Sequence, residues 1–141
     1  MAAANYKQRT IDEFRAKGGR GLPPWGDNIL LMTSTGARSG ERITNPVVMR
    51  KIGDDYVVVA SKGGAPTNPN WYHNVQANPE VEVEVGGPDG IERFRARARA
   101  VPDGPEHERL YKLMTEVWPS FADYQAKTSR VIPVVVLTPI S

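Results

Sequence analysis

The residues best suited to chemistry lie in one glycine-rich loop, Ser61-Lys62-Gly63-Gly64. The apolar run Val57–Ala60 precedes it, and a helix is expected to begin about half a dozen residues later. A hydroxyl, a cation and backbone N–H groups would then meet between a strand and a helix, where an anionic, planar ligand can be held. The sequence contains neither the phosphate-binding pattern GxxxxGK followed by Ser or Thr nor the dinucleotide pattern GxGxxG. The loop therefore predicts a cofactor site without specifying the cofactor.

The composition narrows the classes of function. The chain has 141 residues and no cysteine, which excludes disulfides, thiolate nucleophiles and cysteine-based metal sites. Its two histidines, His73 and His107, have no metal-binding spacing, so we expect no metal, and His73 is interpreted as a surface residue. The 18 basic and 16 acidic residues give no nucleic-acid signal. The chain lacks a signal peptide and an apolar run of about 18 residues, which predicts a cytoplasmic protein without stable membrane insertion.

The elements that must position the loop are mostly strands. Apolar or alternating runs predict strands over Ile29–Thr33, Pro46–Ile52, Tyr56–Ser61, Glu80–Val85, Arg93–Arg99 and Val131–Thr138. The turn Gly53-Asp54-Asp55 joins the second and third strands into a hairpin. Five or six antiparallel strands with a few short helices predict a mainly β (α+β) domain built as a small closed barrel.

Helices are expected between these strands and before them. The predicted helical segments are Ile11–Lys17, Asn68–Asn78 and Asp103–Trp118, and a short segment, Phe121–Thr128, follows the last of them. Thr10 is the expected N-cap of the first and Asn68 of the second, with Pro69 at the first helical position. One domain is predicted over residues 1–141, in which residues 1–27 form an N-terminal helix and linker.

The second hairpin carries a charge pattern that predicts its register. Glu80–Val85 alternates acidic with apolar residues and Arg93–Arg99 alternates basic with apolar ones. Pairing Glu84 with Arg93 places every glutamate opposite an arginine, whereas a shift by one residue would oppose charged and apolar groups. We interpret this ladder as a solvent-exposed face, and the glutamates argue against a nucleic-acid partner.

Several separate blocks occur in the order and spacing of one known family. They are Thr33–Gly40, Asn45-Pro46, Ala60–Gly64, Asn68–Asn74 and Ala77–Pro79, followed by Trp118–Gln125 and Arg130–Pro133. Together they resemble the deazaflavin (coenzyme F420)-dependent nitroreductase family of the split β-barrel, flavin-reductase-like superfamily, over about Ile29 to Pro139. The resemblance implies a split antiparallel β-barrel of about six strands with a few flanking helices.

The same resemblance implies a reductase that uses reduced coenzyme F420. Such enzymes transfer a hydride to electron-poor acceptors: quinones, nitroaromatics and the activated C=C bonds of flat lactones such as coumarins. The cofactor supplies the difficult chemistry, and the protein orients it and excludes competing reactions.

The family positions that contact the cofactor fall in three segments of this chain. They are Arg38, Ser39, Ile43, Thr44, Asn45, Pro46, Val48, Ala60, Ser61, Lys62, Gly63, Asn70, Trp71 and Asn74. Arg38 and Ser39 match positions that meet the phosphate and the acidic tail, where a guanidinium and a hydroxyl suit anionic oxygens. Many relatives carry an arginine at the position of Ile43, whereas this chain has Arg42, which alternation along a strand would direct to the other face.

The family positions on the substrate side are Trp118, Phe121 and Tyr124. Relatives often have a tyrosine in place of Phe121, so this chain lacks that hydroxyl and favours bulky, flat, apolar acceptors. Tyr124 and Ser61 are the candidate catalytic residues, and Tyr124 or solvent would supply a proton.

Two other functions remain open from the sequence. An enzyme of the same fold could use FMN, which also offers a tricyclic ring and a phosphate. A non-catalytic carrier could bind deazaflavin or a flat hydrophobic ligand. The chain could act as a monomer or a homodimer, and its N-terminal helix could cover the site or touch a membrane surface.

Overall fold

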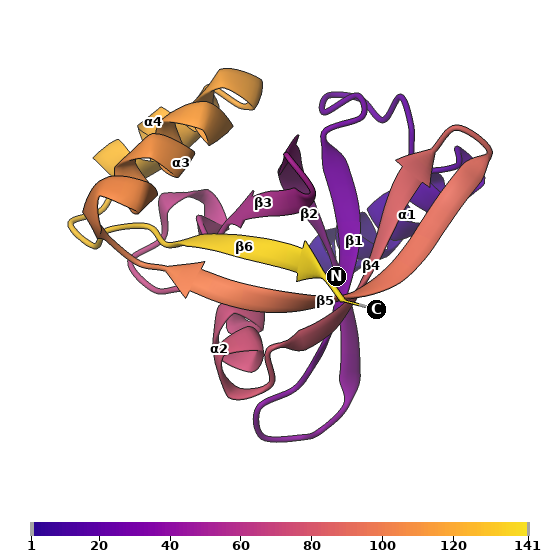
Figure 1. The fold of residues 1–141 in the computed structure, drawn as a ribbon, viewed down its shortest axis with the longest axis horizontal. Coiled ribbons are helices and arrows are strands. Elements are labelled where there is room, and N and C mark those ends of the chain that lie inside the picture. Colours follow the sequence, from indigo (N-terminus) through magenta and orange to yellow (C-terminus); the bar gives the residue numbers. More distant parts are fainter. Residues whose placement is uncertain (1, 141) are drawn as a thin grey trace.

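Six strands, some alternating and some continuously apolar, close into an antiparallel barrel. The computed structural model describes residues 2–140; residues 1 and 141, the ends of the predicted domain, lie outside them. The strands are β1 (Ile29–Thr35), β2 (Arg42–Ile52), β3 (Asp55–Val59), β4 (Glu80–Gly87), β5 (Gly90–Val101) and β6 (Val134–Pro139). They follow the order β1-β2-β3-β6-β5-β4, and β1 also pairs with β4 (Figure 1). The predicted antiparallel barrel with flanking helices is confirmed.

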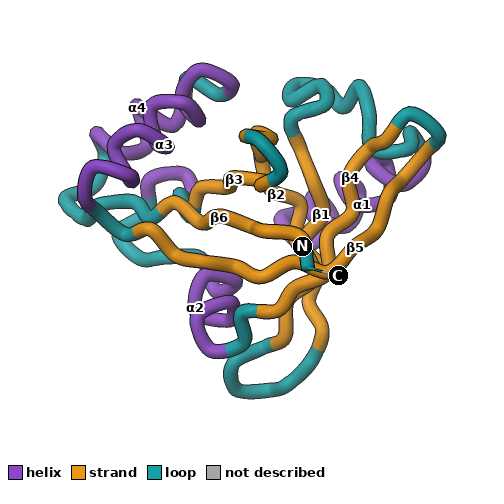
Figure 2. Tube along the Cα trace, in the orientation of Figure 1, coloured by secondary structure: helices purple, strands orange, loops and turns teal. Residues whose placement is uncertain are grey.

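Four α-helices flank the barrel. They are α1 (Ala2–Ala16), α2 (Asn70–Ala77), α3 (Gly104–Val117) and α4 (Ser120–Ala126). α2 lies at one end of the barrel beside the β1–β2 loop, while α3 and α4 lie together near β3 and β6 (Figures 1 and 2). Trp71, Tyr72 and Val75 of α2 pack with Leu30 and other residues of the barrel interior. This burial fixes the first turn of α2 against the barrel.

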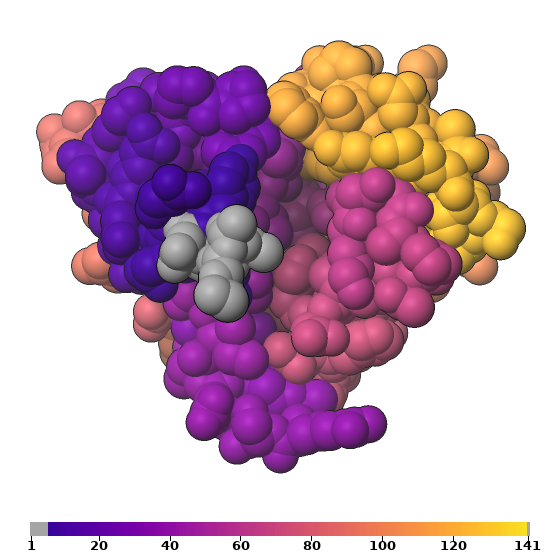
Figure 3. Space-filling view, turned by 180° about the vertical axis from the view of Figure 1, so that it is seen from behind, coloured from indigo at the N-terminus to yellow at the C-terminus, as the bar shows by residue number. Residues whose placement is uncertain are grey.

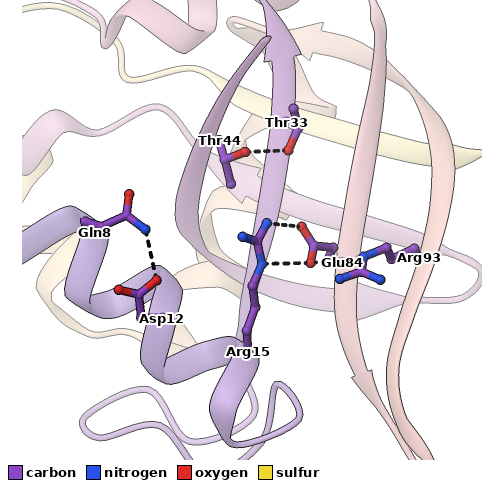
Figure 4. Close-up of polar contacts among 7 residues, drawn as sticks. All are labelled: Gln8, Asp12, Arg15, Thr33, Thr44, Glu84 and Arg93. Atoms are coloured by element: carbon purple, nitrogen blue, oxygen red, sulfur yellow. Dashed lines mark hydrogen bonds and ion pairs between the residues drawn. The ribbon is translucent and has the colours of Figure 1, made fainter.

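The register of the second hairpin is confirmed, but its interpretation as a solvent face is wrong at Glu84. Glu84 pairs with Arg93, as the charge pattern predicts, yet its residue is only 2% exposed. Arg15 of α1 donates hydrogen bonds from Nη2 to Glu84 Oε2 at 2.9 Å and from Nε to Oε1 at 3.2 Å (Figure 4). Arg93 Nε donates to the same Oε1 at 3.3 Å. A carboxylate can be buried here because two guanidinium groups satisfy it.

Helix α1 begins earlier than the sequence predicts. Thr10 is not an N-cap: it lies inside the helix, and its hydroxyl donates to the carbonyl of Tyr6 at 2.9 Å. Ile11 and Phe14 are buried against a cluster that includes Leu31 of β1. Burial of this apolar face supports a longer helix than local capping signals indicate.

Asn68 is not a helix cap either. Helix α2 begins at Asn70, and Asn68 Oδ1 instead accepts a hydrogen bond from Arg130 Nη1 at 2.8 Å. A long-range guanidinium thus replaces the local partner that capping rules expect. β6 begins at Val134, later than predicted, directly after Pro133, which has no N–H for a ladder bond.

We predict that Glu84→Gln lowers the free energy of unfolding by about 1–2 kcal/mol at neutral pH, because it removes the charge that Arg15 and Arg93 hold. Burial raises the pKa of Glu84, but hydrogen bonds and charges from these two arginines outweigh it and lower the pKa below 4.5. The stabilisation by ionised Glu84 is therefore fully present above pH 4.5, and it is lost as the pH falls through the lower folded-state pKa. Urea unfolding across this pH range checks both parts.

The matched control is Glu82→Gln, because Glu82 lies on the same strand and is exposed. It should change stability by less than about 0.5 kcal/mol. Equal effects of the two variants, or a difference that persists in acid, would contradict the assignment.

Candidate functional site

Two neighbouring cavities share β2 and the first turn of α2 as walls. The polar cavity, of about 700 Å³, is lined by Gly36, Ala37, Arg38, Ser39, Ile43, Asn70, His73 and Asn74. The aromatic cavity, of about 410 Å³, is lined by Tyr6, Pro24, Trp25, Pro46, Val47, Val48, Val59, Ser61, Lys62, Gly63, Pro69, Trp71, Trp118, Phe121 and Tyr124. Residues of β2 and of α2 therefore contribute to the walls of both cavities.

The polar cavity depends on the loop between β1 and β2, which α2 holds in place. The backbone N–H of Ala37 donates to the side chain of Asn74 at 3.0 Å, and Asn74 is buried. Within the loop, Ser39 Oγ accepts the N–H of Glu41 at 3.1 Å, which leaves the hydroxyl hydrogen free to donate. Arg38 is exposed on the same loop. A guanidinium, a hydroxyl and amide groups line this cavity, which is the donor set that phosphate and carboxylate oxygens need.

The aromatic cavity lies between β2 and the helices α3 and α4. Its rings include Phe121 and Tyr124, whose centroids are 6.0 Å apart in an edge-to-face arrangement. Trp118, at the end of α3, stands 6.5 Å from Trp25. Figure 3 views the hollowed face of the molecule between the indigo N-terminal segment, the magenta to pink segment of the loop and α2, and the orange helices. Flat walls of this kind accommodate a planar ring system.

The loop Ser61–Gly64 forms the rim of the aromatic cavity in a left-handed conformation. Lys62, Gly63 and Gly64 have φ angles of 48°, 64° and 85°, which is costly for a residue with a side chain such as Lys62. A Cβ atom on Gly64 would lie 2.7 Å from the carbonyl oxygen of Tyr124. Glycine at this position therefore allows the loop to lie directly against α4.

A tyrosine outside both cavities fixes the start of α4. The hydroxyl of Tyr111 donates to the carbonyl of Phe121 at 2.6 Å, and burial raises the pKa of Tyr111 to about 12. Tyr111 therefore stays protonated, and its hydroxyl donates a structural hydrogen bond to Phe121, which lines the aromatic cavity.

The described residues contain no group of three or more His, Cys, Asp or Glu side chains that could hold a metal ion. Among residues 2–140, no helix is both long enough and apolar enough to cross a membrane.

The comparison with protein families matches residues 5–139 to the family of F420H(2)-dependent quinone reductases. The chain belongs to this family. The family resemblance stated from the sequence is thereby confirmed.

Individual relatives agree with the family match. An F420H(2)-dependent quinone reductase of Mycobacterium tuberculosis is 43% identical over 120 residues, covering 84% of this chain and 75% of that protein. The solved structure of an F420-H2-dependent reductase is 43% identical with a TM-score of 0.68, covering 78% of this chain and 93% of its own. A domain-swapped dimer is 38% identical with a TM-score of 0.70 and 92% coverage of both chains.

Most of the predicted site residues line the two cavities of this family member. The polar cavity receives Arg38, Ser39, Ile43, Asn70 and Asn74. The aromatic cavity receives Pro46, Val48, Ser61, Lys62, Gly63, Trp71, Trp118, Phe121 and Tyr124. The structure thus brings together the predicted cofactor and substrate positions from β2, the glycine-rich loop, α2 and α4.

Three predicted cofactor residues line neither cavity. Thr44 bonds to Thr33 across the β1–β2 pair, with the two hydroxyl oxygens 2.7 Å apart (Figure 4). Ala60 is fully buried in the barrel core. Asn45 lies between Thr44 and the wall residue Pro46, paired with Met32. The predicted cofactor contacts of these three residues therefore lie outside the walls of both cavities.

Arg42 does not replace the family arginine at the position of Ile43. Its Nη1 donates to Thr35 Oγ1 at 2.8 Å, and its side chain lines a separate hollow with Arg97. Ile43 lines the polar cavity. Because the arginine stands one residue earlier in this chain, the polar cavity is lined by the apolar side chain of Ile43 where the family resemblance implies an arginine.

Nine cavity residues were not predicted: Gly36, Ala37 and His73 in the polar cavity, and Tyr6, Pro24, Trp25, Val47, Val59 and Pro69 in the aromatic cavity. Tyr6, Pro24 and Trp25 reach the aromatic cavity because α1 and the following segment pack beside the barrel. His73 lies on the surface, as interpreted, and also lines the polar cavity. For the N-terminal residues the sequence offered only the suggestion that their helix covers the site. For His73, a spacing of three residues from Asn70 on the helix was the available signal.

We predict that Gly64→Ala destabilises the protein by about 2–4 kcal/mol, because its Cβ meets the Tyr124 carbonyl at 2.7 Å and its φ is 85°. Gly63→Ala is the control: its φ of 64° is equally left-handed, but its Cβ meets no atom within 4 Å. It should cost about 1 kcal/mol. Thermal unfolding of both variants measures the difference, and equal losses would show that the close approach to α4 is unimportant.

Proposed function

We propose that this chain is an oxidoreductase that transfers a hydride from reduced coenzyme F420 to a quinone, with the cofactor spanning both cavities. The main observation that supports this proposal is that β2 and α2 contribute to both a polar cavity, which includes Arg38, and an aromatic cavity. An acidic molecule with a planar ring at one end fits this pair of environments. Membership in the F420H(2)-dependent quinone reductase family supports the same cofactor and acceptor class.

The donor groups fit the two ends of the cofactor. Arg38 and Ser39 would hold its phosphate and acidic tail at the polar cavity. Lys62 and Ser61, on the rim of the aromatic cavity, would meet the part between phosphate and ring. Trp71 and the β2 residues Pro46 and Val48 would form the apolar wall for the ring. When bound in its reduced form, F420 supplies a hydride.

The aromatic residues of α3 and α4 would bind the acceptor. Trp118, Phe121 and Tyr124 can stack a flat molecule, and Trp25 and Tyr6 close the cavity from the N-terminal side. Holding the acceptor parallel to the cofactor ring lowers the entropic part of the barrier. Nitroaromatics and flat lactones meet the same requirement of shape, so we propose them as further acceptors.

A quinone that gains a hydride needs one more proton to become a hydroquinone. Phe121 has no hydroxyl that could donate this proton, and the Tyr111 hydroxyl already donates a hydrogen bond to the Phe121 carbonyl. Two tyrosines, Tyr6 and Tyr124, line the aromatic cavity, and the Tyr124 ring lies 6.0 Å from that of Phe121, on the side proposed for the acceptor. We assign the proton to Tyr124, with water as the alternative source.

We predict that the protein binds oxidised F420 more tightly than FMN, and that Arg38→Ala and Lys62→Ala each weaken F420 binding about tenfold by removing a cation. Fluorescence titration of both cofactors under identical conditions measures this. Lys112→Ala, an exposed lysine on α3, is the control and should leave binding unchanged. Preferential binding of FMN would indicate a flavin enzyme, and F420 binding without turnover of any quinone would indicate a carrier.

We predict that Tyr124→Phe lowers kcat for quinone reduction about tenfold or more and leaves the Kd for F420 unchanged, since the variant removes only the hydroxyl. Steady-state kinetics with a soluble quinone, beside the F420 titration, separates the two effects. An unchanged kcat would assign the proton to water instead.

A further inference from the structure

One arginine outside both cavities bonds to Ser61 and to residues on both sides of the glycine-rich loop. Arg130 lies between α4 and β6, and its Nη2 donates to the carbonyl of Ser61 at 2.8 Å. Its Nε donates to the carbonyl of Ala65 at 2.9 Å, and Nη1 donates to Asn68 Oδ1 at 2.8 Å. Both terminal nitrogens also lie 3.4 Å from the carbonyl of Ala60. A single guanidinium therefore gathers four oxygen atoms from residues 60 to 68.

These contacts explain how the loop keeps its unusual path. The left-handed turn at Lys62, with φ of 48°, takes the chain out of the β3 strand direction and leaves carbonyl groups without strand partners. A residue in this region of φ and ψ persists only when its surroundings determine the conformation. Arg130 provides that determination through hydrogen bonds on both sides of Lys62.

Arg130 is itself held by α4. The side-chain amide of Gln125 donates to the Arg130 carbonyl at 2.7 Å and accepts the N–H of Ile132 at 2.9 Å. Gln125 directly follows Tyr124, which lines the acceptor side of the aromatic cavity. Hydrogen bonds through Arg130 thus connect helix α4 with the Ser61–Gly64 loop.

We propose that Arg130 is a positioning residue: it acts through the Ser61–Gly64 loop to hold Ser61 and Lys62 at the rim of the aromatic cavity. This inference rests on the proposed function, in which that rim binds F420. Arginine suits the task because its planar fork points five N–H groups in fixed directions. A lysine has one ammonium centre and cannot reach the same set of acceptors together.

The test compares Arg130→Ala and Arg130→Lys with the wild type in F420 titration. Arg130→Ala should raise the Kd about tenfold or more, and Arg130→Lys should restore it only in part. Adding methylguanidinium to Arg130→Ala should lower the Kd again, because the free ion replaces the missing group. In steady-state kinetics, the KM for reduced F420 should rise more than kcat falls.

The matched control is Arg50→Ala. Arg50 also bridges two elements: its Nη1 donates to the Leu113 carbonyl and to Glu116 Oε1, each at 2.8 Å. These bonds join β2 to α3 and do not involve the Ser61–Gly64 loop. The variant should lose stability without a change in the F420 Kd. A change equal to that of Arg130→Ala would overturn the positioning role.

Hydrogen exchange gives the readout that is independent of the cofactor. The amides of Gly64 and Ala65, which bond to Ser61 and Lys62 carbonyls, should exchange faster in Arg130→Lys than in the wild type. If Arg130→Ala fails to fold, Arg130→Lys carries both measurements. Wild-type protein that does not bind F420 overturns the proposed function and this inference with it. Wild-type binding with unchanged Kd and exchange in the variants overturns the inference alone.

Discussion

Closure of the barrel is the constraint on which the rest of the structure depends. β1 pairs with both β2 and β4, so the ladder of backbone hydrogen bonds runs around the ring. Its interior is filled with side chains such as Leu30, Val58 and Val135, which leaves no room there for a ligand. The two cavities described above lie where loops and helices meet β2.

The two cavities differ in the polarity of their walls. The β1–β2 loop presents Arg38 and Ser39 at the surface, where a cation and an anion can approach with a small desolvation cost. The aromatic cavity offers rings and aliphatic walls and places Lys62 at its rim. α2 joins the two, because Trp71 lines one cavity and Asn74 lines the other. A ligand that is charged at one end and flat at the other meets each environment with the matching part.

Buried or half-buried charges connect the outer elements to this framework. Glu84 attaches α1 to the barrel and so places Tyr6 at the aromatic cavity. Arg130 attaches the cofactor loop to the segment after α4. In both cases the charge is satisfied by several well-directed hydrogen bonds, which allows it to leave water. Both contacts join residues more than sixty positions apart in the chain, so they define geometry that neighbouring residues cannot.

The sequence by itself determined the strands, the register of the β4–β5 hairpin, the family and most of the cavity residues. Alternation of apolar residues and pairing of opposite charges are short-range patterns, and the motif blocks carry their chemistry with them. Only the tertiary structure decided that Glu84 is buried, that Thr10 and Asn68 are not helix caps, and that Thr44 and Ala60 line neither cavity. It also decided that Tyr6, Trp25 and Arg130 support the site. These outcomes depend on which distant groups contact each residue in the folded protein, and local sequence propensity contains no information about those partners.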